Sequence, residues 1–303
     1  MPDSHGVPFN LPLMASIETG QIGIMEYLLQ NGANPNSRTT SYRNALEPAA
    51  ELGGFEGIQA CQMLINAGAK PESGEQEPTA QSTLGYNALQ RACRRGEFEI
   101  TRLLLDAGAD ANGTPKAAKA DFPLQLSIRS ENIPIIDIFI SHGADVNVQT
   151  SDGDAITPLL KACSLESPRL VIVQLLIRAG AKVRDSKDKG DRLLQEAIRS
   201  GNCNLVRLLI REGANVDGDG TLGIERDATP LTLAAHNGLL EIMHILLVAG
   251  ARVVDANTLA AKLPATCRDG KHYKEILRKL KSAEEKNKER LLLSDRRGWS
   301  RNS

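Results

Sequence analysis

Apolar residues recur along most of the chain at the spacing of amphipathic helices, and the clearest of these patterns end in a Gly-Ala pair. Apolar side chains stand at positions i, i+3 and i+4 in the segments ITRLLLDAGA, IIDIFISHGA and LVRLLIREGA, which is the period of a helix with one buried face. Glycine suits the residue after a helix, because it adopts the left-handed conformation without a Cβ clash. The pattern predicts a helix that ends at each Gly-Ala pair.

The Gly-Ala pair recurs at a nearly constant interval. Its glycines are Gly32, Gly68, Gly108, Gly143, Gly180, Gly213 and Gly250. Successive gaps are 36, 40, 35, 37, 33 and 37 residues, a period typical of proteins built from stacked repeats. Each repeat in such a protein buries its apolar side mainly against its neighbours. The sequence therefore predicts seven repeats rather than one globular core.

A second helix is predicted upstream of the first in every repeat. Thr157-Pro158 and Thr229-Pro230 place a capping side chain before a proline at the first helical position. One residue past that proline position every repeat has a leucine, and three residues later a small residue, so both share a helix face. The leucines are Leu13, Leu46, Leu89, Leu124, Leu159, Leu194 and Leu231, and the small residues are Ser16, Ala49, Ala92, Ser127, Ala162, Ala197 and Ala234. We expect the leucines in the core and the small residues where neighbouring helices approach closely.

These two helices together resemble the ankyrin repeat family. The family pattern has TPLHLAA in its first helix and continues G-x-x-E-I-V-x-x-L-L-x-x-G-A-D-V-N. Close copies here are TPLTLAAHNGLLEIMHILLVAGARV at residues 229–253 and NALQRACRRGEFEITRLLLDAGADAN at residues 87–112. The resemblance covers roughly residues 9–253. It implies an all-α repeat fold, an ankyrin-repeat α-solenoid of antiparallel helix pairs joined by hairpin loops, with a concave groove.

The rest of the chain is assigned around these seven ankyrin repeats. Residues 1–8 form an N-terminal leader, residues 9–253 the repeats, residues 254–280 a degenerate C-terminal capping repeat, and residues 281–303 a charged tail. Residues 271–303 carry 11 Lys and Arg against 5 Asp and Glu, whereas the remainder carries 25 against 32. We expect the tail to be a frayed helix extension or disordered. Nucleic acid is not the expected partner, because the tail mixes five acidic residues with its bases and has one aromatic residue, Trp299.

The composition bears on the fold class and on the expected cellular compartment of the protein. The chain is 41% hydrophobic, 24% charged and only 3% aromatic, and small aliphatic residues favour packed helices over a β-sandwich. It has no long apolar run and no charged-then-apolar leader, so we expect no membrane span and no signal peptide. Five cysteines without a Cys-x-x-Cys pair predict reduced thiols in a cytoplasmic and/or nuclear protein.

Motifs for catalysis, metals or cofactors are weak. GDGTLG at residues 218–223 matches G-x-G-x-x-G but falls in a loop between repeats, where a turn is the better interpretation. No two of the five histidines stand at i and i+4, as a helical zinc site needs. Cys93 and Cys163 occupy the position of Ala235, so we interpret them as small core residues. The sequence predicts no cofactor, no metal site and no catalytic residues.

A column of polar residues in the first helices is the stronger functional signal. In four repeats, the position after the shared leucine holds a polar residue: a glutamine in three repeats and a threonine in the fourth. Four residues further along the same helix stands an arginine or a histidine. The resemblance places this column on the concave side. Arginine offers a planar fork that suits carboxylate or phosphate groups. The first two repeats have Glu18 and Glu51 at the arginine position instead. The predicted partner-binding residues are Tyr86, Gln90, Arg94, Arg95, Gln125, Arg129, Gln195, Arg199, Thr232, His236 and Asn237.

The sequence therefore favours a protein-interaction module or scaffold. We expect it to bind another protein, one that presents an acidic segment, through the groove and the loop tips. Two alternatives stay open: an enzyme that uses the groove as a pocket for a small anionic substrate, and a recognition part of a larger assembly. The first repeat begins by about residue 9, which favours little structure upstream. A monomer is the expected oligomeric state.

Overall fold

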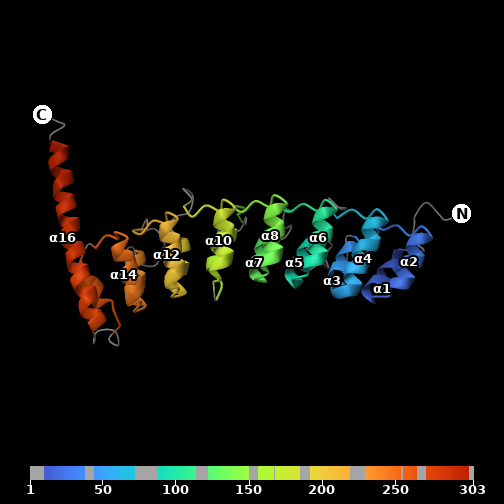
Figure 1. The fold of residues 1–303 in the computed structure, drawn as a ribbon, viewed down its shortest axis with the longest axis horizontal. Helices are drawn as coiled ribbons and strands as arrows, with labels where there is room; N and C mark the ends of the chain where they lie inside the picture. Colours follow the sequence, from blue (N-terminus) through green and yellow to red (C-terminus); the bar gives the residue numbers. More distant parts are fainter. Residues whose placement is uncertain are drawn as a thin grey trace. The chain divides into compact units, whose positions relative to one another are not determined.

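The structure is a computed structural model that consists of helices and their connections. It describes residues 10–37, 44–71, 87–113, 122–149, 156–166, 168–184, 192–218, 229–253, 255–264 and 271–299. Every regular element among these residues is an α-helix, as predicted, and the helices follow one another in pairs (Figure 1). The chain divides into two compact units. Unit 1 comprises Met1–Lys161 with Arg178–Ala181, and unit 2 comprises Ala162–Ile177 with Lys182–Ser303.

Unit 1 contains four of these helix pairs. They are α1 (Asn10–Glu18) with α2 (Ile22–Gln30), α3 (Leu46–Leu52) with α4 (Gly54–Asn66), α5 (Ala88–Arg95) with α6 (Phe98–Asp106), and α7 (Pro123–Arg129) with α8 (Ile133–Ser141). The first helices α1, α3, α5 and α7 pack side by side in that order, and the second helices α2, α4, α6 and α8 do the same. The pairs of this unit are therefore stacked in one direction, as the resemblance implied.

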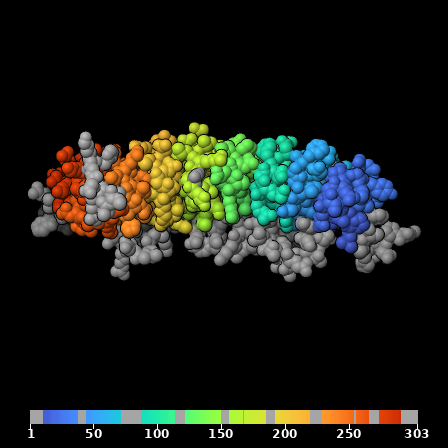
Figure 2. Space-filling view, turned by 90° about the horizontal axis from the view of Figure 1, so that it is seen from below, coloured from blue at the N-terminus to red at the C-terminus, as the bar shows by residue number. Residues whose placement is uncertain are grey.

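Unit 2 repeats this arrangement. Its helices are α10 (Leu170–Arg178, the last residue excepted), α11 (Arg192–Arg199), α12 (Cys203–Arg211), α13 (Pro230–His236), α14 (Leu240–Val248), α15 (Ala256–Ala261) and α16 (Lys271–Trp299), while α9 (Pro158–Cys163) contains the boundary between the units. The first helices α11, α13 and α15 pack in order, and so do the second helices α12, α14 and α16. Within each unit the space-filling view shows the side chains of successive pairs in contact (Figure 2).

The core includes the two columns that the sequence predicted, together with apolar residues of the second helices. All seven leucines are at most 2% exposed, and all seven small residues are at most 4% exposed. Where the small residue is a serine, its hydroxyl bonds to the helix: Ser16 Oγ donates to the Leu13 carbonyl at 2.7 Å, and Ser127 Oγ to the Leu124 carbonyl at 2.7 Å. A buried hydroxyl therefore has its partner in the leucine of the same helix, and the prediction of both columns is confirmed.

The predicted helix ends are also confirmed. The seven glycines of the Gly-Ala pairs have φ between +77° and +97°, the left-handed region in which a side chain is strained. At the other end, Thr157 Oγ1 accepts from the Leu160 amide at 3.1 Å and Thr229 Oγ1 from the Thr232 amide at 3.2 Å. Proline follows each threonine as the first helical residue. Local sequence alone thus sets where these helices start and stop.

Turn residues after the Gly-Ala pair join each repeat to the next. The Asn112 side chain donates to the Gly143 carbonyl at 3.3 Å and accepts from the Asp145 amide at 2.6 Å. Asn36 bonds in the same way to the backbone of the following repeat in unit 1. In unit 2, Asp217 accepts from the Arg252 amide at 2.7 Å. The polar residues of the connectors therefore have a structural role in fixing the register of neighbouring repeats.

Two elements depart from the regular repeat. The second repeat has extra residues at 53–57: Gly53 precedes α4, and the others form the first turn of this helix, which has 13 residues where α2, α6 and α8 have 9. The charged segment from residue 281, expected to be a frayed helix extension or disordered, continues α16 as helix to Trp299. Ile276 and Leu280 are buried on the side that faces α14 and α15. Farther along, the Asn287 side chain donates to the Val253 carbonyl at 3.2 Å. These contacts anchor the first part of the charged helix to unit 2.

Candidate protein-interaction surface

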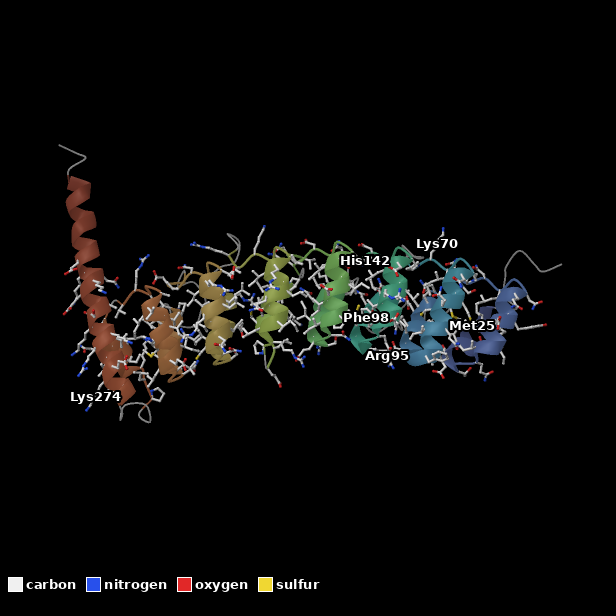
Figure 3. The ribbon with its side chains drawn as sticks, in the orientation of Figure 1. Met25, Lys70, Arg95, Phe98, His142 and Lys274 are labelled. Carbon is white, nitrogen blue, oxygen red and sulfur yellow. The ribbon has the colours of Figure 1, made fainter. Side chains whose placement is uncertain are left out.

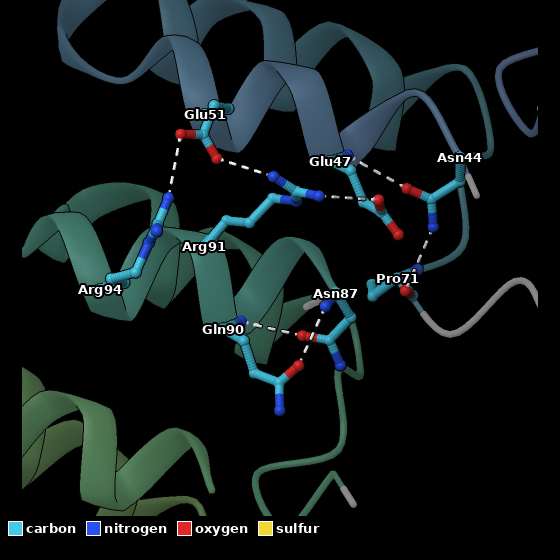
Figure 4. Close-up of polar contacts among 8 residues, drawn as sticks. All are labelled: Asn44, Glu47, Glu51, Pro71, Asn87, Gln90, Arg91 and Arg94. Atoms are coloured by element: carbon cyan, nitrogen blue, oxygen red, sulfur yellow. Dashed lines mark hydrogen bonds and ion pairs between the residues drawn. The ribbon is translucent and has the colours of Figure 1, made fainter. Parts of the chain in front are cut away.

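The glutamines of the predicted binding column are buried, and two of them, Gln90 and Gln125, are helix caps. Gln90 stands three residues after Asn87, and the two side chains bond to each other's backbone at the start of α5 (Figure 4). The Asn87 side chain accepts from the Gln90 amide at 2.8 Å, and the Gln90 side chain accepts from the Asn87 amide at 3.0 Å. This reciprocal capping box satisfies two amides that a helix start otherwise leaves without partners.

The same role recurs in α7. The Gln125 side chain accepts from the Phe122 amide at 3.1 Å and donates to the Ile156 carbonyl at 2.6 Å. Gln90, Gln125 and Gln195 are 1%, 0% and 6% exposed, so a partner protein does not reach them. Their assignment to the binding surface was wrong. A signal in the sequence identifies Gln90: it stands three positions after Asn87, and a polar residue followed three positions later by glutamine is typical of a helix start. Thr232 is half-buried: its amide donates to the Thr229 hydroxyl at 3.2 Å, and its own hydroxyl donates to the Thr229 carbonyl at 2.8 Å.

The arginines of the column lie at the other end of the helices and are exposed. Arg94 and Arg95 end α5, Arg129 ends α7, and Arg199 ends α11 in unit 2. The side chains of Arg94, Arg95 and Arg199 are 46%, 41% and 54% exposed. A cation at a helix C-terminus is stabilised by the partial negative charge of the free carbonyls. The helix dipole therefore explains why arginine suits this position. The guanidinium groups themselves extend toward solvent.

An ion-pair cluster between α3 and α5 holds one of these arginines (Figure 4). Arg94 Nη2 lies 3.2 Å from Glu51 Oε1, and Arg91 Nη1 lies 2.9 Å from Glu51 Oε2. Arg91 also reaches Glu47, whose side chain is only 3% exposed, at 3.6 Å. The glutamate at the column's arginine position in the second repeat and the arginine at the same position in the third therefore pair with each other. Sequence reasoning missed Arg91 and Glu47, because nothing in one repeat indicates which residue of the next lies opposite.

The cluster has a buried part and an exposed part. Removal of one partner from a buried ion pair destabilises a protein by on the order of 3–5 kcal/mol, because the other charge stays buried without a partner. Glu47 and Arg91 form this inner part and act in the packing of α3 on α5. An exposed pair contributes only about 0–1 kcal/mol. The exposed pair of Glu51 and Arg94 is therefore open to exchange with a carboxylate from outside.

The remaining predicted site residues do not gather at one place. His236 ends α13, and Asn237 is the residue after it; both are exposed in unit 2. Tyr86 lies outside the described residues. In unit 1, Arg95 lies at the edge where α5 passes into α6, opposite the edge that carries Lys70 and His142 (Figure 3). The structure thus brings together Arg94, Arg95 and Arg129 on the adjacent helices α5 and α7.

Features that would support catalysis are few in the described part of the chain. Its residues include no group of three or more His, Cys, Asp and Glu side chains placed to hold a metal ion. Cys61, Cys93 and Cys163 are buried, and burial raises the pKa of the Cys61 and Cys163 thiols to about 12, which disfavours the nucleophilic thiolate. Among the described helices, none combines the length and apolar character that a bilayer crossing requires. Two cavities of the described part, of about 370 and 260 Å³, are lined by residues of α12, α14 and α16 with the turn after α14, and not by the arginines above.

Known proteins share this repeat pattern. The curated relatives include the ankyrin repeat and KH domain-containing protein mask-1 of Caenorhabditis elegans, 30% identical over 248 residues, which are 80% of this chain and 9% of that protein. Rabankyrin-5 of Homo sapiens is 29% identical over 190 residues, 62% of this chain and 16% of that protein. The chain thus spans less than a fifth of the length of these two relatives.

Solved structures and family models cover most of the chain. The ankyrin repeat domains of Bcl-3 and of human ASB11 superpose with a TM-score of 0.59 each, at 24% and 23% identity, over 77% and 78% of this chain and 97% of each of those chains. A model described as "Ankyrin repeats (3 copies)" matches residues 46–150, 126–219 and 159–258, and one described as "Ankyrin repeat" matches residues 10–40. Ankyrin repeats generally mediate protein–protein interaction. The chain belongs to the ankyrin repeat family.

Proposed function

We propose that this chain binds an acidic segment of a partner protein through the exposed guanidinium groups that end its first helices. The observation that carries the proposal is the position of Arg94 and Arg95 on α5 beside Arg129 on α7, all three exposed within unit 1. We call these three residues the arginine edge. Arginine binds carboxylates with two parallel hydrogen bonds, so that it gives orientation as well as charge attraction.

The backbone that carries the arginine edge is held firmly. The caps at Asn87 with Gln90 and at Phe122 with Gln125 fix the starts of α5 and α7, and the second of these glutamines also ties α7 to the carbonyl of Ile156. A surface that is ordered before binding loses less conformational entropy in the complex. The buried glutamines therefore support recognition by positioning, although they do not contact the partner.

The ion pairs that the arginines already make within the protein affect how tightly we expect the partner to bind. A partner carboxylate that binds Arg94 displaces Glu51, which lies 3.2 Å away in an exposed pair. Since such a pair contributes only about 0–1 kcal/mol, the exchange costs little. Electrostatic contacts of this kind mainly increase the association rate and the specificity. The proposed complex should therefore weaken as salt concentration rises.

Selection from a phage-displayed peptide library tests the proposal without a known partner. The wild-type chain is the bait, and the selected peptides are synthesised and their dissociation constants measured by fluorescence anisotropy. We expect the selected peptides to be enriched in Asp and Glu. The triple variant Arg94→Glu, Arg95→Glu, Arg129→Glu should bind them at least about tenfold more weakly, because each attractive contact becomes repulsive.

The matched control reverses a charge elsewhere in unit 1. Arg102→Glu changes an exposed arginine of α6, a second helix that does not carry the arginine edge, and should leave the affinity unchanged. Circular dichroism and thermal melts establish that each variant is folded. Arg199→Glu tests the equivalent position of unit 2 on its own. Peptides without acidic enrichment, or unchanged affinity of the folded triple variant, would overturn the proposal.

A further inference from the structure

Two cavities lie on either side of α14 in unit 2, on the second helices rather than the first. One, of about 370 Å³, is lined by Leu247 and Val248 of α14 and by Lys279, Ser282 and Lys286 of α16, among others. The other, of about 260 Å³, lies between α12 and α14. Val248 lines both and is 73% exposed. The exposed valine continues the apolar walls of the two hollows across α14.

Small residues create the larger cavity. Where α16 faces the end of α14, it presents Ser282 and Ala283, which do not fill the space opposite Leu247 and Val248. The smaller cavity has Ile210 and Ile245 in its wall. Sites for drug-sized molecules typically have about 300–1,000 Å³, so these cavities are at or below the lower end of that range. They suit single apolar side chains of a larger partner better than a complete small molecule.

Every charged side chain that lines the two cavities is basic. Arg207 and Arg211 line the smaller cavity, and Lys279 and Lys286 line the larger. His244, whose ring accepts a hydrogen bond from Lys279, also lines the smaller cavity. No Asp or Glu is among the lining residues of either. The apolar floors are therefore bordered by cations on both sides of α14. We call the two cavities with these five residues and Val248 the α14 surface.

The cations of the α14 surface are held in place from outside the cavities. Arg211 Nη2 lies 3.0 Å from Glu212 Oε1, and Lys279 Nζ lies 2.8 Å from Glu275 Oε1. Lys279 Nζ also donates to the His244 ring at 2.7 Å, which connects α16 to α14 at the border of the larger cavity. These pairs are solvent-exposed and weak. A partner's carboxylates can therefore share or replace them.

We propose that the α14 surface binds an acidic amphipathic helix of a partner protein. Two apolar side chains of that helix enter the cavities on either side of Val248, and its carboxylates meet Arg211, Lys279 and Lys286. An amphipathic helix places apolar anchors at i and i+3 or i+4 along one face, which is how helices bind grooves between helices. The surface lies on second helices of unit 2, so this proposal does not rest on the arginine edge.

Binding of designed helical peptides tests the proposal. The acidic leucine probe is a fluorescein-labelled peptide with leucines at i, i+3, i+4 and i+7 and glutamates at the flanking positions. A second probe has lysine at every glutamate position. A third, the glutamine probe, has glutamine at every leucine position. We expect the full-length protein to bind the acidic leucine probe and to bind the other two at least about tenfold more weakly. Equal binding of the glutamine probe or of a single-stranded oligonucleotide of the same charge would overturn the proposal, because it would indicate a surface that binds any polyanion.

Variants locate the site. Arg211→Glu with Lys286→Glu reverses the charge of the α14 surface, and Ser282→Leu fills the larger cavity from an exposed position without a charge change. Each should weaken binding of the acidic leucine probe by about tenfold or more. The matched control, Lys274→Glu with Arg278→Glu, makes the same charge change on α16 outside both cavities (Lys274 is labelled in Figure 3). Unchanged binding by both site variants, or an equal loss of binding in the control, would overturn the proposal. The variants of the arginine edge should bind the acidic leucine probe with wild-type affinity.

Discussion

At the scale of single residues, one turn carries backbone strain that the equivalent turns avoid. Between the helices of their pairs, Gly20, Gly96, Gly201 and Gly238 have positive φ, and α7 and α8 are joined instead through Glu131 at φ +53°. The left-handed conformation costs a residue with a side chain roughly 1–2 kcal/mol. Glutamate at this position therefore lowers the stability of the repeat relative to its neighbours.

Replacement of Glu131 by glycine should relieve that strain. We expect Glu131→Gly to raise the free energy of unfolding by about 0.5–1 kcal/mol, because the relief exceeds the added flexibility of glycine in the unfolded chain. Urea unfolding monitored by circular dichroism measures the change. Ser130→Gly is the control, since Ser130 has an ordinary helical φ of −78°, and it should destabilise the protein. A variant at residue 131 no more stable than wild type would contradict the strain argument.

The cysteines give a second prediction at this scale. Cys61, Cys93 and Cys163 are buried, and burial raises the pKa of the Cys61 thiol to about 12, so at pH 8 only about one thiol in ten thousand is ionised. Cys203 is partly exposed. In a variant with Cys203→Ser and Cys267→Ser, we expect the three buried thiols to react with a disulfide reagent only after urea is added. Rapid reaction of the native variant would show that these thiols are not in the core.

The residues also show what local sequence can and cannot predict. The leucine column and the capping glycines were predictable, because their roles depend on neighbours three or four positions away. The glutamines were misassigned for a related reason: the i, i+4 spacing of Gln90 and Arg94 places both on one helix side, but Gln90 bends back to the helix start and Arg94 extends into solvent. The spacing along a helix predicts on which side a side chain lies, whereas its hydrogen-bond partner decides whether it caps the helix or faces solvent.

At the scale of elements, the connection between α3 and α4 shows how an insertion is accommodated. Gly53 has φ +66° and ψ −173°, a combination that essentially only glycine adopts. A Cβ added there would lie 2.3 Å from the carboxylate oxygen of Glu97. The amide of Gly54 donates to the same oxygen at 3.2 Å. The inserted residues therefore lengthen α4 and contact the third repeat through Glu97.

Gly53→Ala should destabilise the protein by about 1–3 kcal/mol, through backbone strain and the clash with Glu97. The matched control is Gly23→Ala in α2, where an added Cβ meets no atom within 4 Å. That change should stabilise the protein by about 0.5–1 kcal/mol, because alanine favours a helix. Chemical denaturation of the two variants side by side gives the comparison. Equal effects of the same sign would contradict this account of the connection.

The C-terminal helix marks the limit of prediction from sequence at this scale. A degenerate second helix followed by a charged extension was readable from GKHYKEILRKL and the run after it. The larger cavity, between α14 and α16, was not predictable, since it arises from which small residues of α16 lie opposite Leu247 and Val248. That pairing depends on packing between residues more than 30 positions apart, which no local pattern records.

At the scale of the whole molecule, stability should be distributed in the way that repeat proteins distribute it. Each helix pair contacts mainly its neighbours within its unit, so the free energy is close to a sum of repeat and interface terms. Leu89 is 2% exposed in the first turn of α5. Leu89→Ala should therefore lower stability by roughly 2–5 kcal/mol, and the loss should be local before it is global.

Hydrogen exchange followed by mass spectrometry distinguishes a local from a global loss. We expect Leu89→Ala to increase exchange most in α3 to α8, and least in α12, α14 and the anchored part of α16, because sub-global opening follows the contacts of one unit. Leu231→Ala is the mirror control, since Leu231 is 1% exposed in α13 and should shift the increase to unit 2. If both variants raised exchange equally everywhere, the chain would unfold as one cooperative body. The division into two units would then have no energetic meaning, and an arginine edge in one unit and an α14 surface in the other would not be stabilised independently.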